Sequence, residues 1–186
     1  MTGVQTCALP ISYLSYLVLV PLVVPALTLR TGRYRQFLTV GIALIVSQVV
    51  LDAGYWLFQS EVPRTVDPPP GFLGDLVRLV RGNDNPFNAF PSAHCTWTTI
   101  ALIALWRLRR RFPRTAWTLL VWLPLVYPAT VMLEQHVLID VYAGLFIGFA
   151  CYWAVMFAVE RPVLTPSGPD GARSPIRPGP SDRYGR

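Results

Sequence analysis

The chain has two histidines, His94 and His136, and their types and positions are the ones best suited to chemistry. His94 follows the polar stretch at residues 88–93, and His136 lies one helical turn before Asp140. Each histidine opens an apolar run long enough to enter a bilayer, where polar groups are costly. We therefore expect the two helix starts to face each other at one side of a membrane and to handle a phosphate between them.

The residues before His94 favour the start of a helix. Pro91 and Ser92 are residue types that are common at the first positions of helices. A helix start presents unpaired N–H groups and about half a positive charge, and both attract anions. His94 is then placed to donate a proton to a bound anion. The alternative is a capping serine beside an interfacial histidine, with no substrate.

His136 and Asp140 share one face of the second helix, because they are separated by one turn. A carboxylate at this depth in a membrane helix needs a partner, and His136 is the nearest candidate. An aspartate that accepts from one ring nitrogen leaves the other nitrogen free to attack, as in the catalytic triad. A hydrogen-bonded pair that only stabilises the helix start is the alternative. The occurrence of both histidines at span starts favours catalysis.

The composition predicts an all-α fold, a polytopic bundle of membrane helices. A hydrophobic content of 53% and a mean hydropathy of +0.42 exceed the usual values for a soluble domain, and the apolar residues fall into blocks. Five spans are predicted, at residues 13–29, 37–58, 91–108, 116–133 and 136–159. Residues 71–81 have the pattern of a short amphipathic helix in the interface plane. Gly144 and Gly148 have the spacing of a close helix–helix contact.

The two ends of the chain differ from this membrane domain, which we place at residues 12–159. Residues 1–11 resemble the translation of a sequencing-adapter oligonucleotide, and we expect them to be an artefact that replaces the native N-terminus. Residues 160–186 are rich in proline, glycine, serine and arginine, and are predicted to be a disordered tail.

The net charge of +6 comes from arginine alone, since the chain has no lysine. Thirteen of the sixteen arginines fall in the first connection, the third connection and the tail. The positive-inside rule makes these segments cytoplasmic and places both histidines outside. Topology therefore explains the charge, and no nucleic-acid partner is expected. The three cysteines, Cys7, Cys95 and Cys151, have neither disulfide nor metal-site spacing.

The stretch Phe90-Pro91-Ser92-Ala93-His94, followed by His136-x-x-x-Asp140, resembles the type 2 phosphatidic acid phosphatase superfamily. The pattern in that superfamily is Pro-Ser-Gly-His, then Ser-Arg-x5-His-x3-Asp. The closer resemblance is to the branch of inositol phosphorylceramide synthases and related bacterial proteins, which read Asn-x-x-Pro-Ser-Leu-His and later Thr-x4-Gln-His-x3-Asp. Thr130 and Gln135 fit that second form. The resemblance covers roughly residues 63–150.

The resemblance implies a metal-independent phosphatase or phosphotransferase that acts on lipid phosphates in a bacterial plasma membrane, without a cofactor. It implies a family core of six spans, of which we expect the first to be truncated in this sequence. His136 would be the nucleophile that forms a phosphohistidine, Asp140 would orient it, and His94 would protonate the leaving oxygen. The amides near Ser92 and Ala93 would hold phosphate oxygens.

Three features depart from the family pattern. The first family motif, Lys-x6-Arg-Pro, is absent, and Pro63-Arg64 is the nearest match, so Arg64 is the candidate phosphate clamp. Arg78 and Arg81 are weaker candidates, with a solvated interfacial face as their alternative role. Thr130 stands where the wider family has arginine.

The third departure is Glu134, which stands where relatives often have a base and which puts a negative charge beside the phosphate. It keeps open a non-catalytic alternative, a lipid-binding relative or a transporter. A second alternative is a metal-dependent enzyme with His94, His136 and Asp140 as ligands. The head group, the phosphoryl acceptor and the oligomeric state are not specified by these motifs.

Overall fold

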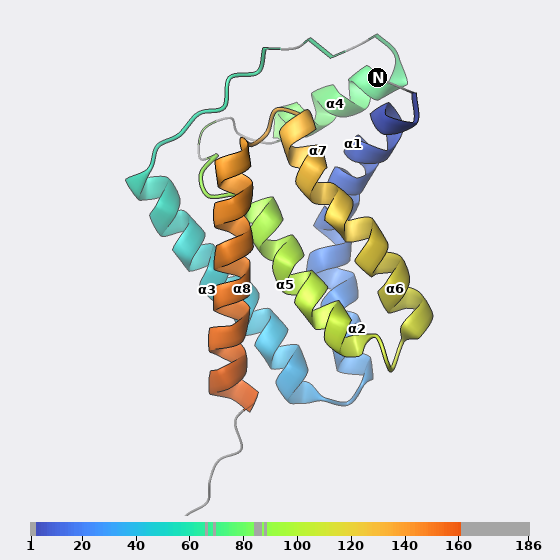
Figure 1. Cartoon of the computed structure of the whole chain (residues 1–186), viewed down its shortest axis with the longest axis vertical. Helices are drawn as coiled ribbons and strands as arrows, with labels where there is room; N and C mark the ends of the chain where they lie inside the picture. The colour runs from blue at the N-terminus through green and yellow to red at the C-terminus, as the bar shows by residue number, and fades with distance from the viewer. Residues whose placement is uncertain (1–2, 66, 69, 84–86, 88, 161–186) are drawn as a thin grey trace, which may run out of the picture.

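The apolar runs of the sequence fold as helices that lie side by side in the computed structural model (Figure 1). The structure describes residues 3–65, 67–68, 70–83, 87 and 89–160. In chain order the α-helices are α1 (Gly3–Val18), α2 (Val24–Arg30), α3 (Tyr34–Leu57), α4 (Phe72–Asn83), α5 (Ala93–Leu108), α6 (Pro113–Trp122), α7 (Val126–Met132) and α8 (Leu138–Glu160). The all-α prediction is confirmed: over these residues the only β-pairing is an isolated bridge between Glu61 and Phe87.

Four helical runs are long and apolar enough to cross a membrane, which makes the chain an integral membrane protein. These runs are Leu9–Arg30, Tyr34–Leu57, Pro113–Met132 and Leu138–Glu160. Two of them are continuous across prolines, because a π-helical turn at Leu19–Val23 joins α1 to α2 and a 3₁₀ turn at Leu123–Leu125 joins α6 to α7. Proline removes a backbone donor, and such local adjustments re-pair the freed carbonyls.

The third predicted span, α5, is shorter than the other four. Its 16 residues extend about 24 Å at the usual helical rise, less than the roughly 30 Å of a hydrocarbon core. It contacts α2, α3, α6, α7 and α8, and more than half of its side chains are buried. α5 is therefore the central helix of the bundle. Its neighbours fix the position of its first turn, which contains His94.

Two glycines set the distance between α5 and α8. A Cβ atom on Gly144 would lie 2.6 Å from the carbonyl oxygen of Ser92, and one on Gly148 would lie 2.5 Å from that of Thr96. No larger residue fits at either position unless the backbone moves. The predicted small-residue contact is confirmed, and it presses the start of α8 against the start of α5.

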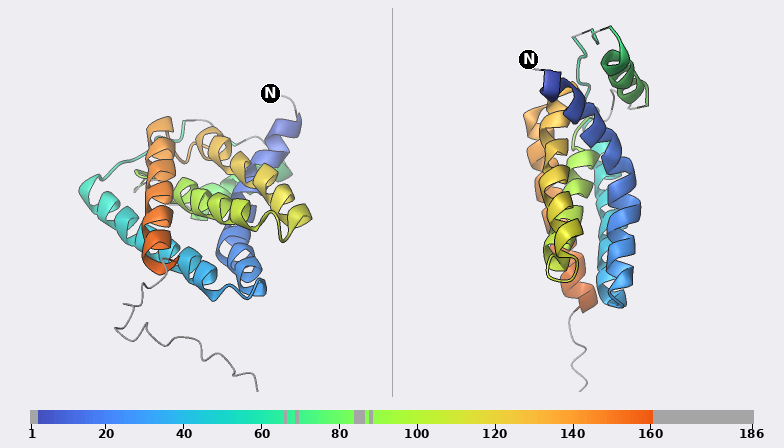
Figure 2. Two further views of the ribbon diagram at one scale, coloured as in Figure 1. Left: turned by 60° about the horizontal axis from the view of Figure 1, so that its bottom comes forward. Right: turned by 90° about the vertical axis from the view of Figure 1, so that its right-hand side faces the viewer.

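Helix α4 confirms the predicted short amphipathic helix, although part of its apolar face does not face lipid. Val80 is buried in a cluster with Tyr13, Ala129 and Leu133, and Val77 packs against it. These partners belong to α1 and α7. Figures 1 and 2 show α4 at the end of the bundle where α1 begins. The helix thus covers this end of the protein.

Two predictions concern the chain ends. α1 begins at Gly3, so the first helical run starts earlier than the predicted residue 13 and includes part of the segment 1–11. α8 ends at Glu160. The predicted disordered tail from residue 161 onward lies outside the described residues.

Candidate active site

The structure brings the two histidines together. Nδ1 of His94 lies 3.2 Å from Nε2 of His136, and the ring centroids are 5.4 Å apart. His94 is in the first turn of α5, and His136 lies two residues before α8. The predicted convergence of the two helix starts is therefore confirmed at hydrogen-bond distance.

A backbone carbonyl fixes the tautomer of His136. Nδ1 of His136 lies 2.8 Å from the carbonyl oxygen of Ala89. Because a carbonyl only accepts hydrogen bonds, Nδ1 carries the proton and Nε2 of the neutral ring carries a lone pair. That lone pair faces His94, which donates its Nδ1 proton to it. Sequence reasoning missed Ala89, since a main-chain acceptor has no signature in residue type.

Asp140 lies beside this hydrogen bond but does not make it. Its Oδ2 is 3.6 Å from Nδ1 of His136 and accepts from the backbone N–H of Val137 at 2.9 Å. The carboxylate therefore caps the start of α8 and puts a negative charge next to the ring. The direct orienting contact that the sequence assigned to Asp140 is made by Ala89 instead. Both His136 and Asp140 are buried.

The start of α5 is built as the sequence predicts. Ser92 is the N-cap, and its Oγ accepts from the N–H of Cys95 at 3.3 Å. The Ser92 N–H donates to the carbonyl of Asp140 at 3.2 Å, so it joins the two helix starts and does not face a phosphate. This corrects the prediction for Ser92. The Ala93 N–H donates to no acceptor in the described part of the chain.

Ser60, in the loop after α3, and Thr130, in α7, hold the two segments that carry the histidines. Ser60, just after α3, accepts from the Ala89 N–H through its carbonyl at 3.3 Å and from the Phe90 N–H through its Oγ at 2.8 Å. The carbonyl of Thr130 accepts from the N–H of Gln135 at 2.9 Å and from that of His136 at 3.2 Å. Thr130 therefore ends α7 and sets the direction in which His136 leaves it.

The His94 ring lies against two tyrosines of α1. Its centroid is 4.5 Å from that of Tyr13 and 4.8 Å from that of Tyr16, and both tyrosines are buried. Their spacing of three residues puts both on one helical face. That spacing is the only sign in the sequence that the two tyrosines contact one common partner.

Two arginines approach the site from the loop and from α4. Nη2 of Arg64 donates to Oε1 of Gln135 at 3.1 Å, and its Nη1 donates to the carbonyl of Arg81 at 2.6 Å. The Arg81 side chain pairs with Glu134, with Nη2 and Oε2 2.7 Å apart. Gln135 directly precedes His136, so Arg64 lies near the predicted nucleophile. The role of Arg64 as a phosphate clamp stays a prediction, since both of these contacts are to protein groups.

The predicted solvated role is wrong for Arg81 and agrees with the structure for Arg78. The Arg81 side chain is only 14% exposed in its ion pair with Glu134, whereas Arg78 pairs with Asp75 on an exposed face. Glu134 also accepts from Thr65, at 2.9 Å, and has a φ of 55°. A non-glycine residue in this left-handed region is uncommon and is held there by its surroundings. Arg81 compensates the negative charge of Glu134.

The arrangement has the parts that phosphoryl transfer requires. Nε2 of His136 is a nucleophile with a lone pair, and His94 is a proton donor beside it. The Ala93 N–H and the two guanidinium groups attract anions. Among the described residues no group of three or more His, Cys, Asp and Glu side chains is arranged to hold a metal ion.

Comparisons with known proteins agree with this chemistry. The model of the PAP2 superfamily matches residues 3–154, a range that contains both histidines and Asp140. Neither the comparison with curated proteins nor that with solved structures found a match. Because the superfamily match covers most of the sequence, this chain belongs to the PAP2 superfamily, whose members are phosphatases and related phosphoesterases.

Proposed function

We propose that the protein is an integral membrane phosphatase or phosphotransferase that acts on lipid phosphates through a phosphohistidine. The observation that carries the proposal is the pair of imidazoles: Nε2 of His136 has its lone pair directed at His94, 3.2 Å away, because Ala89 holds the proton on the other nitrogen. A nucleophile and a proton donor on adjacent helix starts can act on the two sides of one phosphorus atom once the rings separate to admit it.

In the first step, Nε2 of His136 attacks the phosphorus and the bond to the lipid oxygen breaks. His94, protonated to the imidazolium beside the negatively charged bound phosphate, gives a proton to that leaving oxygen, which departs as an alcohol and leaves His94 neutral. A phosphoryl group needs more room than the 3.2 Å between the nitrogens, so substrate binding has to turn the His94 ring away from His136. The positive charge that forms on the phosphorylated ring lies next to the Asp140 carboxylate.

In the second step, an acceptor attacks the phosphohistidine and gives its proton to the now neutral His94. The bond between nitrogen and phosphorus breaks, and His136 regains its lone pair. Water as acceptor gives a phosphatase, and an alcohol gives a transferase. The resemblance of Thr130, Gln135 and His136 to inositol phosphorylceramide synthases favours an alcohol such as inositol.

The phosphate oxygens are bound by Arg64 and by the Ala93 N–H. Phosphoryl transfer depends mainly on alignment and on neutralising the phosphate charge, and guanidinium groups supply that charge without a metal ion. Glu134 does not prevent binding, because Arg81 already neutralises it at 2.7 Å. The feature that favoured a non-catalytic protein is therefore compensated within the structure.

The position of the site favours a lipid as substrate. His94 and His136 lie at the starts of α5 and α8, and a site at the end of an apolar bundle can be reached by a lipid phosphate whose acyl chains remain in the hydrocarbon. Two substrates that share a glycerol phosphate group and differ only in their acyl chains test this preference. Phosphatidic acid should be hydrolysed faster than glycerol 3-phosphate by the protein in detergent micelles. Equal rates on the two would contradict the assignment of a lipid substrate.

The nucleophile is tested by replacing His136 with alanine. Phosphate release from phosphatidic acid should fall at least about 10³-fold, because no other group replaces Nε2. A rapid quench without acid should trap phosphohistidine in the wild type and none in the variant. The activity of the wild-type protein should survive a strong chelator. Wild-type turnover by the folded variant would exclude this mechanism.

The proton donor is tested with two leaving groups. His94→Asn should lower the hydrolysis of an alkyl phosphate by about 10²–10⁴-fold. It should lower that of 4-nitrophenyl phosphate much less, because a nitrophenolate leaves without a proton. His136→Ala should lose both activities. An equal loss on the two substrates in His94→Asn would show that His94 positions the substrate and does not protonate it.

A further inference from the structure

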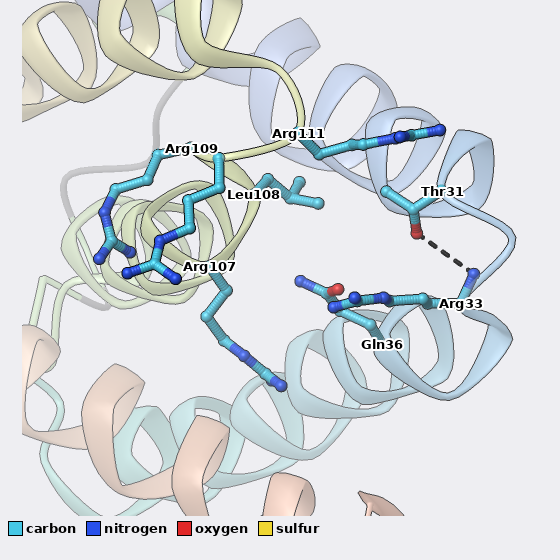
Figure 3. A pocket seen from close by; sticks show the side chains of 8 residues that line it. Thr31, Arg33, Gln36, Arg107, Leu108, Arg109 and Arg111 are labelled. Carbon is cyan, nitrogen blue, oxygen red and sulfur yellow. Dashed lines mark hydrogen bonds between the residues drawn. The ribbon is translucent and has the colours of Figure 1, made fainter.

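A cavity of about 570 Å³ lies at the end of the bundle opposite the two histidines. It is formed by the turn between α2 and α3, the last turn of α5 and the connection that follows (Figure 3). Its lining residues are Thr31, Arg33, Gln36, Arg107, Leu108, Arg109, Arg110 and Arg111. Five of these eight residues are arginines, so the cavity carries a concentrated positive charge.

Two of the five arginines already have structural roles. Arg107 bonds to both carboxylate oxygens of Glu160, at 2.8 and 2.5 Å, and to the hydroxyl of Tyr152 at 3.0 Å. Arg109 lies 3.8 Å over the ring of Trp106 and donates to the Trp106 carbonyl. These contacts tie the end of α5 to α8 and cap its last turn.

The other three arginines leave an excess of positive charge. Arg110 and Arg111 form no ion pair with any described residue. The Arg33 guanidinium is attracted by the Glu160 carboxylate, but that carboxylate is already paired with Arg107. Figure 3 shows the Arg33 side chain extending from the turn between α2 and α3 toward Gln36, and the Arg111 side chain extending from the connection after α5 toward α2. One carboxylate cannot neutralise five guanidinium groups, so the net charge of the cavity favours the binding of an anion.

Gln36 gives an independent indication of a ligand. Its side chain is 4% exposed and lines the cavity, yet its Nε2 has no hydrogen-bond partner among the described residues. A buried donor that lacks an acceptor is costly, and a ligand oxygen would remove that cost. The start of the 24-residue helix α3 lies beside it and adds its own partial positive charge.

We propose that this cavity binds the phosphate of an anionic phospholipid from the arginine-rich side of the membrane. The positive-inside rule explains why arginines are numerous at this end, but it does not require them to gather around one cavity. It accounts neither for a cavity lined by five of them nor for a buried amide donor. The cavity opens at the ends of membrane helices, where head groups lie, and basic pockets of this kind bind anionic head groups. None of the lining residues is a histidine, a cysteine or a carboxylate, and the Thr31 hydroxyl donates to the Thr28 carbonyl, so the proposal is one of binding and not of turnover.

Lipid binding to the delipidated full-length protein in detergent tests the site, with native mass spectrometry as the measurement. Phosphatidylglycerol should bind more tightly than phosphatidylcholine. The double variant Arg33→Gln/Arg111→Gln should weaken phosphatidylglycerol binding at least about tenfold, because charge-assisted hydrogen bonds are lost. The matched control Arg30→Gln/Arg114→Gln removes two equally exposed arginines at the same end that do not line the cavity, and it should change phosphatidylglycerol binding less than about threefold. Equal losses in both double variants would overturn the proposal in favour of unspecific attraction.

Gln36→Leu separates binding from folding. The substitution keeps the size and the net charge and removes only the buried amide, so phosphatidylglycerol binding should weaken while thermal stability is unchanged or higher. Lower stability with unchanged binding would overturn the proposal. Inorganic phosphate serves as the probe for a free anion: if it displaces phosphatidylglycerol at millimolar concentration, the lipid assignment is wrong. None of these outcomes depends on catalysis at His136.

Discussion

At the scale of single residues, two groups divide the functions of a triad aspartate, which both fixes the histidine tautomer and stabilises the positive charge on the ring. The Ala89 carbonyl fixes the His136 tautomer at 2.8 Å, while Asp140 lies 3.6 Å from the same nitrogen. A carbonyl has no net charge, so it orients the ring but does little for the positive charge that develops on it. Two unit charges about 4 Å apart interact by about 4 kcal/mol at an effective dielectric constant near 20. The carboxylate should therefore act mainly through its charge.

This division of roles predicts a partial effect for Asp140→Asn. The turnover number should fall by about 10²–10³-fold, because the charge is lost. The fall should stay below the roughly 10⁴-fold expected where the aspartate alone holds the tautomer. Phosphate release under saturating substrate measures it. The free energy of unfolding should change by less than about 1 kcal/mol, since the asparagine oxygen still accepts from the Val137 N–H. A variant as inactive as His136→Ala would mean that Asp140 takes part directly in proton transfer.

Residue identity made part of this site predictable. His94, His136 and Asp140 are ionisable groups at the starts of apolar runs, where their cost marks them. Ala89 acts through its main chain and left no sign in the sequence. Tyr13 and Tyr16 have types that are as common in any membrane helix as beside an imidazole. The inward turn of Arg81 toward Glu134 depends on where α4 packs, which local spacing does not specify.

At the scale of elements, the contact between α5 and α8 determines the distance between the histidines. Gly144 lies against the Ser92 carbonyl, two residues before His94, and Gly148 lies one turn deeper. The Ser92 N–H also donates to the Asp140 carbonyl across this contact. The geometry of the site is thus a consequence of how closely two helices approach.

Gly144→Ala should therefore impair activity more than its effect on folding would indicate. The added Cβ would meet the Ser92 carbonyl at 2.6 Å and force the helices apart, at a cost of about 1–3 kcal/mol in unfolding free energy. Phosphate release and thermal unfolding in detergent measure the two effects. Gly148→Ala, with a similar clash further from the histidines, should lose similar stability and keep more activity.

A matched control for both glycine variants is Gly41→Ala in α3. A Cβ there has no atom within 4 Å, so the alanine should be neutral or stabilise the helix by up to about 1 kcal/mol. If Gly144→Ala behaved like this control, the close contact would not position the site.

The helices themselves were largely predictable, because arginine and proline interrupt the apolar runs where the bundle turns. Most boundaries agree with the sequence pattern to within about three residues. The packing of α4 was not predictable, since an apolar stripe that covers lipid and one that covers protein have the same periodicity. Val77 and Val80 therefore read as interfacial, although they pack on α1 and α7.

At the scale of the whole molecule, the bundle has two chemically different ends. The histidines and the pair of Arg81 with Glu134 are at one end, and the cavity lined by five arginines is at the other. Arginine-rich connections remain on the cytoplasmic side during insertion. From this rule we predict that the proposed catalytic end lies outside the cell and the proposed lipid-binding end inside.

This orientation is tested by labelling single cysteines in intact bacteria. Glu61→Cys lies on the histidine side and Thr115→Cys on the arginine side, and both positions are exposed. In a Cys7→Ser background the remaining Cys95 and Cys151 are buried and should not react. A membrane-impermeant maleimide should label Glu61→Cys in whole cells and label Thr115→Cys only after the membrane is opened. The reverse pattern would place the histidines in the cytoplasm, where they would meet lipid phosphates of the inner leaflet.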